Sequence, residues 1–257
     1  RINSEVTKLS STNSDRIDQW VNSKILQLTE TLKAYPEFAT MDIKEVKSYL
    51  EYIKQSDPEL EVINITDENG IDADNMDGSQ LSFFTVPRDT KSLFIEGVVT
   101  SEVTNERTFV ISAPMYDTEE FSGVLFSVIK LKALEDIVDQ IKVGETGYAY
   151  IVSSEGKLIY HPKEEWIGTN IKDVLELDSD KVLSDEIITK DSGLVKFNDI
   201  DGEVMIEAFS KIPSTDWRLV VTAPYDEIYA KSNNLKSVTS VLILTVTILV
   251  ILISTFI

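Results

Sequence analysis

The stretch GYAYIVSSEGKLIYHP, from Gly147 to Pro162, carries the clearest structural pattern of the chain. Two runs rich in β-branched and aromatic residues flank the turn-forming residues Ser154 to Gly156. This order predicts a strand, a tight turn and a returning strand. A loop with a short helix, roughly Ile171 to Ile188, is expected next. After it we expect a hairpin around Asp201-Gly202 and a final strand in DWRLVVTAP, from Asp216 to Pro224.

A similar unit precedes this stretch. The turn TDENG of this unit matches the turn SSEGK. The stretch GVLFSVIKLKALEDI matches WRLVVTAPYDEI, because in both stretches a strand runs into a helix that leaves the unit. A loose, acidic and irregular segment is expected to end at about Lys91. The expected elements are a helix over 43–54 that Pro58 closes, an alternating strand over 60–66, β-rich runs over 93–101, 107–116 and 121–129, and a helix over 131–141.

The chain up to Leu32 predicts one long helix. Apolar residues recur at spacings of three and four from Ile2 onward, and neither Gly nor Pro occurs before Pro36. Such a helix would be roughly 50 Å long at 1.5 Å per residue. Two compatible arrangements remain open. The helix packs along its own domain, or it also forms a stalk that pairs with a second copy.

Composition narrows the classes of function. The 257 residues suggest one or two domains, and a hydrophobic content of 42% supports a globular core. A net charge of −20 disfavours binding to nucleic acid and to anionic lipid, because both are negatively charged. Without cysteine there is neither a disulfide framework nor a thiolate metal site. The sequence contains no HExxH, GxSxG, P-loop or GxGxxG signature, so we expect a non-enzymatic protein without a cofactor.

The stretch SVTSVLILTVTILVILISTFI, from Ser237 to Ile257, predicts a membrane-spanning helix. It has no charge, Pro or Gly, and it is long enough for a bilayer core of roughly 30 Å. A buried core helix is the alternative, but such helices rarely run this long without a polar face. Lys231 and Lys236 precede the stretch as interfacial anchors. The abrupt start at Arg1, inside a helical pattern, suggests a piece of a longer protein, with an earlier span before Arg1 and a cytoplasmic output after Ile257.

These features together resemble the double Cache family of extracellular sensors. The resemblance rests on the long first helix, VISAPMYD, GVLFSV, GETGYAYIVSSEGKLIYHP, IGTNI and DWRLVVTAPYDEI, and it covers nearly the whole chain. It implies an α+β fold with two tandem PAS-like antiparallel-sheet modules, homodimeric receptors in the cell membrane, and capture of a small ligand mainly in the membrane-distal module. We expect a stalk helix (1–40), a distal module (41–141), a proximal module (142–230) and a transmembrane helix (231–257), with residues 1 to about 232 extracellular or periplasmic.

The resemblance does not extend to the usual binding of an α-amino acid. The amino-acid-sensing subgroup of the family has an Arg-x-Trp-Tyr cluster, then a Tyr and an Asp on the third strand and an Asp on the last strand. Here Arg88 has no Trp-Tyr after it, Val99 and Ser101 replace the Tyr and Asp, and Val128 replaces the last Asp. An α-amino acid needs an anion for its ammonium as well as a cation for its carboxylate.

We expect a ligand pocket between the distal sheet and the segment 83–91, with Phe83 and Phe84 in its lining. Arg88 is the candidate for binding an organic anion, because a guanidinium matches a carboxylate in bidentate fashion. A solvated Arg88, paired with Asp89 or a nearby acid, is the alternative. For Ser101, Ser112, Met115 and Tyr116 the alternative to ligand binding is that they are ordinary strand residues without a role in binding. The candidates beyond the segment 83–91 are Val99, Ser101, Ser112, Met115, Tyr116 and Val128.

No metal site is expected. The loop DENGIDADNMDGS fails the calcium spacing, because Met76 and Phe83 fall on ligand positions when the count starts at Asp72. His161 is the single histidine, and one histidine without cysteine cannot make the usual zinc cluster. We therefore expect a capping or packing role for His161.

The expected function is that of a ligand-sensing domain of a bacterial transmembrane receptor, with a chemotaxis transducer as the first choice. A sensor domain of a histidine kinase or a diguanylate cyclase is the alternative within the same class. A membrane-anchored adhesion or structural ectodomain without a small ligand is an alternative of another class. An ectoenzyme would need a convergent acid–base pair, for which the sequence offers no marker.

Overall fold

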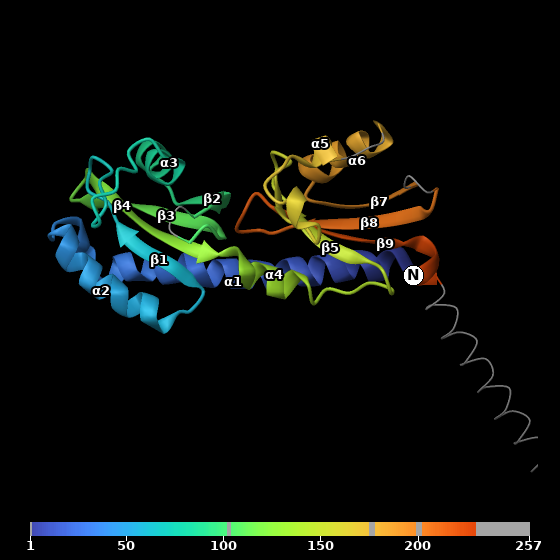
Figure 1. Ribbon diagram of the computed structural model, residues 1–257, viewed down its shortest axis with the longest axis horizontal. Coiled ribbons are helices and arrows are strands. Elements are labelled where there is room, and N and C mark those ends of the chain that lie inside the picture. The colour runs from blue at the N-terminus through green and yellow to red at the C-terminus, as the bar shows by residue number, and fades with distance from the viewer. Residues whose placement is uncertain (1, 102–103, 175–177, 199–201, 230–257) are drawn as a thin grey trace, which may run out of the picture.

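A computed structural model describes residues 2–101, 104–174, 178–198 and 202–229. Two antiparallel sheets stand next to one another along a single long helix, α1 (Ile2–Ala34), as Figure 1 shows. The helix and the two sheets confirm the expected α+β fold. α1 packs against both sheets, which is the first of the two arrangements expected for it.

The first sheet has the strand order β1-β4-β3-β2. α2 and α1 pack on one face, called here the α1 face, and α3 covers the opposite face, called here the α3 face. The chain leaves this sheet through α4, which ends at Val138 and is therefore shorter than expected. The elements are η1 (Pro36–Ala39), α2 (Ile43–Ser56), β1 (Leu60–Ile65), α3 (Ser82–Thr90), β2 (Phe94–Thr100), β3 (Arg107–Asp117), β4 (Glu120–Lys130) and α4 (Leu131–Val138).

The helix α3 corrects the expectation of an irregular segment up to Lys91. Its Pro87 has no N–H to donate, and an interior proline ordinarily disfavours a helix. Phe84 and Pro87 are nevertheless buried, and Phe84 belongs to the hydrophobic cluster on the α3 face. Burial against the sheet therefore outweighs the low helix propensity that Pro87 gives this segment.

The second sheet has the strand order β6-β5-β9-β8-β7. The loop after β6 contains two α-helices where one short helix was expected. β7 pairs with β8 as expected, while Asp201 in the connecting turn lies outside the described residues. The elements are β5 (Tyr148–Val152), β6 (Leu158–Tyr160), η2 (Glu164–Trp166), α5 (Ile171–Val174), α6 (Asp178–Thr189), β7 (Ser192–Asn198), β8 (Val204–Lys211) and β9 (Arg218–Pro224).

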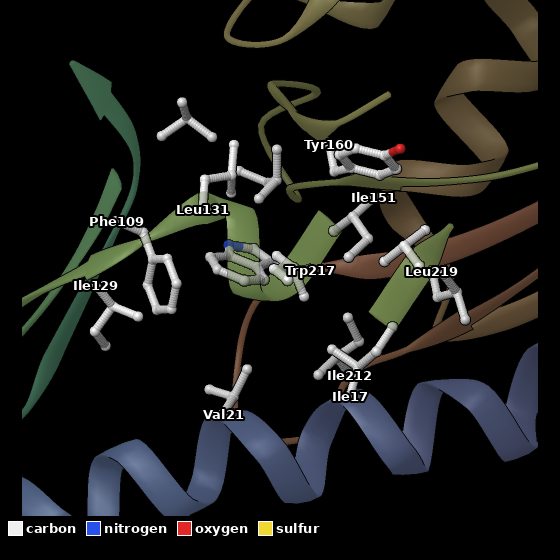
Figure 2. Packing of buried hydrophobic residues seen from close by; sticks show 14 of the residues in the cluster. Ile17, Val21, Phe109, Ile129, Leu131, Ile151, Tyr160, Ile212, Trp217 and Leu219 are labelled. Atoms are coloured by element: carbon white, nitrogen blue, oxygen red, sulfur yellow. The ribbon is translucent and has the colours of Figure 1, made fainter. Parts of the chain in front are cut away.

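One hydrophobic core joins α1 to both sheets, as Figure 2 shows. Trp217, just before β9, is 1% exposed and packs edge-on against Phe109 of β3, with ring centroids 5.7 Å apart. Ile17 and Val21 of α1 are fully buried in the same cluster. Apolar burial is the main favourable term in folding, so this junction holds the two sheets together.

Polar contacts fix α1 at both ends of this core. Lys24 is 8% exposed, and its ammonium lies 2.6 Å from carboxylate oxygens of both Asp57 and Glu59. Burial alone would raise the pKa of Asp57, but the hydrogen bond from Lys24, the backbone N–H of Glu59 and the charge of Lys24 bring that pKa below its usual value. Near the second sheet, Ser14 donates a hydrogen bond to the carbonyl oxygen of Lys211.

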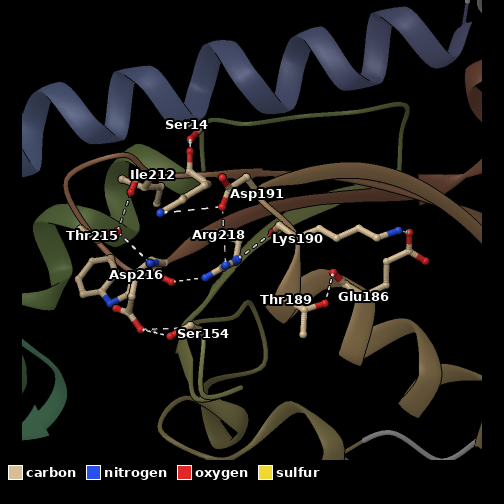
Figure 3. A network of polar contacts seen from close by, with 12 residues as sticks. Ser14, Ser154, Glu186, Thr189, Lys190, Asp191, Ile212, Thr215, Asp216 and Arg218 are labelled. Atoms are coloured by element: carbon tan, nitrogen blue, oxygen red, sulfur yellow. Dashed lines mark hydrogen bonds and ion pairs between the residues drawn. The ribbon is translucent and has the colours of Figure 1, made fainter.

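A network around Arg218 ties the second sheet together (Figure 3). The guanidinium of Arg218 donates to the carbonyl oxygens of Lys190 and Asp216. The Asp216 carboxylate accepts hydrogen bonds from the backbone N–H and the hydroxyl of Ser154, in the turn between β5 and β6. This network therefore connects the end of α6, the start of β9 and the β5–β6 turn.

His161 has the capping and packing role expected for it. It is 4% exposed, its ring centroid lies 4.5 Å from that of Trp166, and its Nδ1 accepts the N–H of Lys163. Burial, helped by the charge of Lys163, lowers the pKa of His161 to about 4. The imidazole is therefore neutral in the folded protein at pH 7.

Within the part of the chain that the structure describes, no helix is both long enough and apolar enough to cross a membrane. The stretch from Ser237 to Ile257 lies outside the described residues.

We expect Trp217→Ala to lower the free energy of unfolding by about 3–5 kcal/mol, because it removes a buried ring from the junction of both sheets. Denaturant titrations followed by circular dichroism measure the change. Val204→Ala is the control, since Val204 is 42% exposed on β8, and it should change stability by no more than about 0.5 kcal/mol. Separate unfolding of one sheet, with the other unaffected, would contradict a shared core.

We expect His161 to make stability fall as the pH is lowered from about 6.5 toward 4. The unfolded chain binds a proton on His161 below its normal pKa of 6.5, whereas the folded protein does so only near its lowered pKa of about 4. The loss reaches at most about 1.4 kcal/mol per pH unit. Urea titrations at about pH 6.5 and about pH 5 measure the slope, which His161→Phe should reduce. An equal slope in the variant would show that other groups cause it.

Candidate ligand-binding site

Two rows of side chains cross the α3 face of the first sheet. Residues directly opposite one another on paired strands share a face of the sheet. The register therefore aligns Glu96, Val110, Val128 and Val62 in one row, and Phe94, Ser112, Phe126 and Asn64 in the next. Each row contributes polar groups to a surface that is otherwise apolar.

The helix α3 lies over these rows through its aromatic side chains. Phe83 contacts Phe126 with ring centroids 4.6 Å apart, and Phe84 contacts Phe121 at 5.7 Å. Ser82, the first residue of α3, shares a side-chain hydrogen bond with Glu96. The helix therefore brings Phe83 and Phe84 onto the α3 face of the sheet, where the segment 83–91 was expected to lie.

Hydroxyl groups without a hydrogen-bond partner gather around the same strands. Among the described residues, the buried hydroxyl oxygens of Ser112, Tyr116 and Ser122 make no hydrogen bond. Ser112 itself is completely buried, between Phe94 and Phe126 in its row. An unpartnered buried hydroxyl costs stability, and such groups are rare in folded proteins. Ser112 and Tyr116 are two of the residues that the sequence suggested for contact with a ligand.

A bulge in β2 decides which of its side chains reach this face. The register between β2 and β3 shifts between Glu96 and Val99. Ile95 and Val98 consequently both pack in the core on the α1 face, three residues apart, while Val99 joins the cluster on the α3 face. Because of this extra residue, Glu96 and Val99 share the α3 face although they are three residues apart.

Glu96 is the acidic residue of the two rows. Burial raises its pKa above the usual value, against the lowering effects of the Ser82 hydroxyl and of the charge of Lys157. Lys157 comes from the β5–β6 turn of the second sheet, and its ammonium donates a hydrogen bond of 2.7 Å to the carbonyl oxygen of Val98. The edge strand of the site is therefore in direct contact with the neighbouring sheet.

Arg88 is partly exposed and paired with Asp89, which is the arrangement that the sequence suggested as the alternative to anion binding. It lies in the last turn of α3, where its Nε is 2.8 Å from the carboxylate of Asp89 and its side chain is 41% exposed. Its guanidinium also lies 5.4 Å from the ring centroid of Phe84. Arg88 thus sits at the rim of the aromatic cluster with its charge balanced.

Two other expected residues lie away from the rows. Met115 packs in the core on the α1 face, because it alternates with Ser112 and Tyr116 along β3. Ser101 donates its hydroxyl to the buried carboxylate of Glu61, which also accepts the hydroxyl of Thr104. Met115 therefore does not share a surface with the other candidates, and Ser101 closes the end of the β2–β3 connection.

Carboxylates of the acidic loop before α3 accept hydrogen bonds from backbone N–H groups of the same loop. Asp72 accepts the N–H groups of Asp74 and Met76, and Asp67 accepts those of Asn69 and Ile71. Such contacts are typical of Asx turns, in which a short acidic side chain stabilises a loop.

Sequence reasoning did not identify Glu96 or Ser122. The alternation of Phe94 and Glu96 in LFIEGVVTS was the available signal for Glu96, but a count backward from Val99 assigns Glu96 to the other face. The bulge between Glu96 and Val99 reconciles the two counts, because it brings both residues to the α3 face. Ser122 lies at a second register shift, between Met115 and Tyr116 on the partner strand.

Comparisons with known proteins agree with the architecture. A family model described as a Cache domain, dCache_1, matches residues 1–232. The methyl-accepting chemotaxis protein PctB of Pseudomonas aeruginosa is 21% identical over 136 residues, which is 52% of this chain and 20% of that protein. McpA of Bacillus subtilis is 28% identical over 113 residues, 44% of this chain and 15% of that protein. The matched stretch thus spans a fifth or less of either relative.

Solved structures show the same fold. The extracellular domain of mmHK1S-Z3, assigned as a histidine kinase, has a TM-score of 0.79 at 17% identity and covers 91% of this chain and 98% of its own. The ligand-binding domain of PctB from P. aeruginosa PAO1 in complex with L-Arg has a TM-score of 0.73 at 16% identity, with 89% and 97% covered. Together with the family match, the long helix and two antiparallel sheets establish that the chain belongs to the double Cache family of non-catalytic, ligand-binding sensor domains.

Proposed function

We propose that this chain is the sensor domain of a bacterial transmembrane chemoreceptor and that a small solute binds on the α3 face of the distal module. The unpartnered hydroxyls of Ser112, Tyr116 and Ser122 carry this proposal. A ligand with polar groups would satisfy these hydroxyls, while Phe83 and Phe126 contact its apolar part. Ligand sites in proteins commonly combine such an apolar lining with a few polar groups.

We propose that the stretch from Ser237 to Ile257 anchors the chain in the membrane, with the two sheets outside the cell. A homodimer is proposed with it, because the resemblance to the double Cache family implies one. A contact near the end of the second sheet favours transmission toward this anchor. Glu227 follows β9, and its carboxylate accepts the backbone N–H groups of Glu145 and Thr146 and the hydroxyl of Thr146. The hydrogen bonds from Thr146, and then that from Glu145, lower the pKa of Glu227. The exit from β9 is thereby tied to the linker between the modules.

For a signal to pass, the ligand must bind one arrangement of α3 and the sheet more tightly than another. β3 offers a route, because it carries Ser112 on the α3 face and Phe109 in the core against Trp217. A movement of β3 at the ligand would therefore shift the junction between the two sheets.

A histidine kinase sensor is the second candidate. It is favoured by the structural similarity to the extracellular domain of mmHK1S-Z3. The chemotaxis transducer remains the first candidate, because relatives such as PctB and McpA are methyl-accepting chemotaxis proteins. Both candidates share the same sensing step, and they differ in the output that the domain would control.

We expect a small solute to raise the melting temperature of the full chain. A ligand at 100 times its dissociation constant adds about 2.7 kcal/mol of stability. Thermal unfolding followed by tryptophan fluorescence, against a panel of amino acids, carboxylates, amines, purines and sugars, measures the shift. A flat response to the whole panel would contradict the proposal and would favour a structural ectodomain.

We expect Ser112→Ala to weaken binding of the ligand so found by at least fivefold, while the unliganded protein stays as stable or gains about 1 kcal/mol. The variant removes a buried hydroxyl that has no partner in the unliganded protein but would gain one from the ligand. Ser127→Ala is the matched control, because Ser127 is buried on the neighbouring strand with Ile111 and Ile63 as its paired residues. Equal binding losses in both variants would place the ligand elsewhere.

A further inference from the structure

We infer that the site selects a ligand with a positively charged amino group, and that Glu96 is the residue that binds this group. The inference rests on the function proposed above and assigns a ligand class to the same site. It replaces the organic anion that Arg88 suggested at the level of sequence.

The position of Glu96 is the first argument. Glu96 and Ser112 lie in adjacent rows of the α3 face, with Val110 and Phe94 completing the corner between them. An ammonium group at this corner would donate to the Glu96 carboxylate, and its remaining N–H groups could reach hydroxyl oxygens, which also accept hydrogen bonds. Hydrogen bonds between an ammonium and a carboxylate are roughly twice as strong as those between neutral groups.

The surrounding aromatic rings favour the same charge. Phe126 is paired with Ser112 across the strands and packs against Phe83, and the faces of aromatic rings attract cations. Arg88 already exploits this attraction at the rim, where its guanidinium lies 5.4 Å from the Phe84 ring. A small amine with an apolar substituent would therefore find both a carboxylate and aromatic surface.

The electrostatic state of Glu96 points in the same direction. Burial raises the pKa of Glu96, because the charged carboxylate loses hydration in the folded protein. The hydrogen bonds and charges around the carboxylate replace this lost hydration only in part. Two groups face it from neighbouring elements, the Ser82 hydroxyl of α3 and the Lys157 ammonium of the β5–β6 turn, and they offset this effect only in part. A bound cation would supply the missing compensation.

The nearby cations are poorly placed to hold an anionic ligand. Arg88 is paired with Asp89, and Lys157 donates a hydrogen bond to the carbonyl oxygen of Val98. A carboxylate entering the rows would in addition be repelled by Glu96. We therefore expect an amine to bind without the α-carboxylate that an amino acid carries.

Matched sets of ligands test this inference by calorimetric titration of the full chain. One set is isobutylamine, valine and 3-methylbutanoate, and another is phenethylamine, phenylalanine and 3-phenylpropanoate. We expect an amine to bind, at least as tightly as its amino acid, and the acids to give no heat. Glu96→Gln should weaken amine binding at least tenfold, whereas Glu120→Gln, the same charge change at an exposed acid of β4, should leave it within twofold.

Lys157→Met gives an independent test of opposite sign. Removing this positive charge should tighten amine binding severalfold, because Lys157 acts on Glu96 with the same sign of charge as the ligand. Unliganded Glu96→Gln should melt no lower than the wild type, since it removes a carboxylate that burial disfavours. This comparison separates a lost binding group from a damaged fold.

The failure of the inference differs from the failure of the proposed function. Binding of the acids but not the amines, or equal amine binding by Glu96→Gln and Glu120→Gln, overturns the ligand class and leaves a sensor of another solute. Loss of acid binding in Arg88→Gln would assign the site to an anion. If no member of either ligand set binds, the amine as ligand class is overturned. If the broad panel of solutes also gives no thermal shift, the proposed sensor function is overturned as well.

Discussion

The packing of α1 against both sheets is the constraint on which the rest of the structure depends. Trp217 next to β9 meets Phe109 of β3 above Ile17 and Val21 of the helix. Neither sheet can leave α1 without exposing apolar surface of the other, and such exposure is the main cost of unfolding. The two modules therefore share one core, and their relative position is fixed by side-chain packing as well as by the intervening chain.

This arrangement gives the candidate site its connection to the rest of the molecule. β3 carries Ser112 on the α3 face and Phe109 and Ile111 in the core against α1, so one strand belongs to both. β2 carries Glu96 on the same face and accepts a hydrogen bond from Lys157 of the second sheet at Val98. A ligand between α3 and these strands would act on elements that already contact the second sheet.

Much of the fold follows from sequence pattern. The apolar spacing from Ile2 to Leu32 predicts α1, and period-two alternation with turn residues predicts the strands of the two sheets. The helix α3 escapes such reasoning, because Pro87 argues against it locally and only burial on the sheet stabilises it. The stretch from Ser237 to Ile257 lies outside the described residues, so its role in the membrane stays a prediction.

The candidate site is only partly predictable for a related reason. The common face of Phe83, Phe84 and Ser112 follows from the expected packing of the segment 83–91 against the first sheet. Glu96 depends on a bulge, and a single extra residue moves every side chain beyond it to the opposite face. Alternation within a strand therefore predicts a face reliably only where the strand pairs without interruption.

Native-state hydrogen exchange along α1 tests the shared core most directly. Amides near Val6 and Ile17 lie in the core with the second sheet, and those near Leu28 lie in the core with the first. A shared core predicts that the slowest amides of both halves exchange with one free energy of opening, equal to that of global unfolding. Two distinct values, one for each half of the helix, would show that the modules unfold independently and would contradict the account.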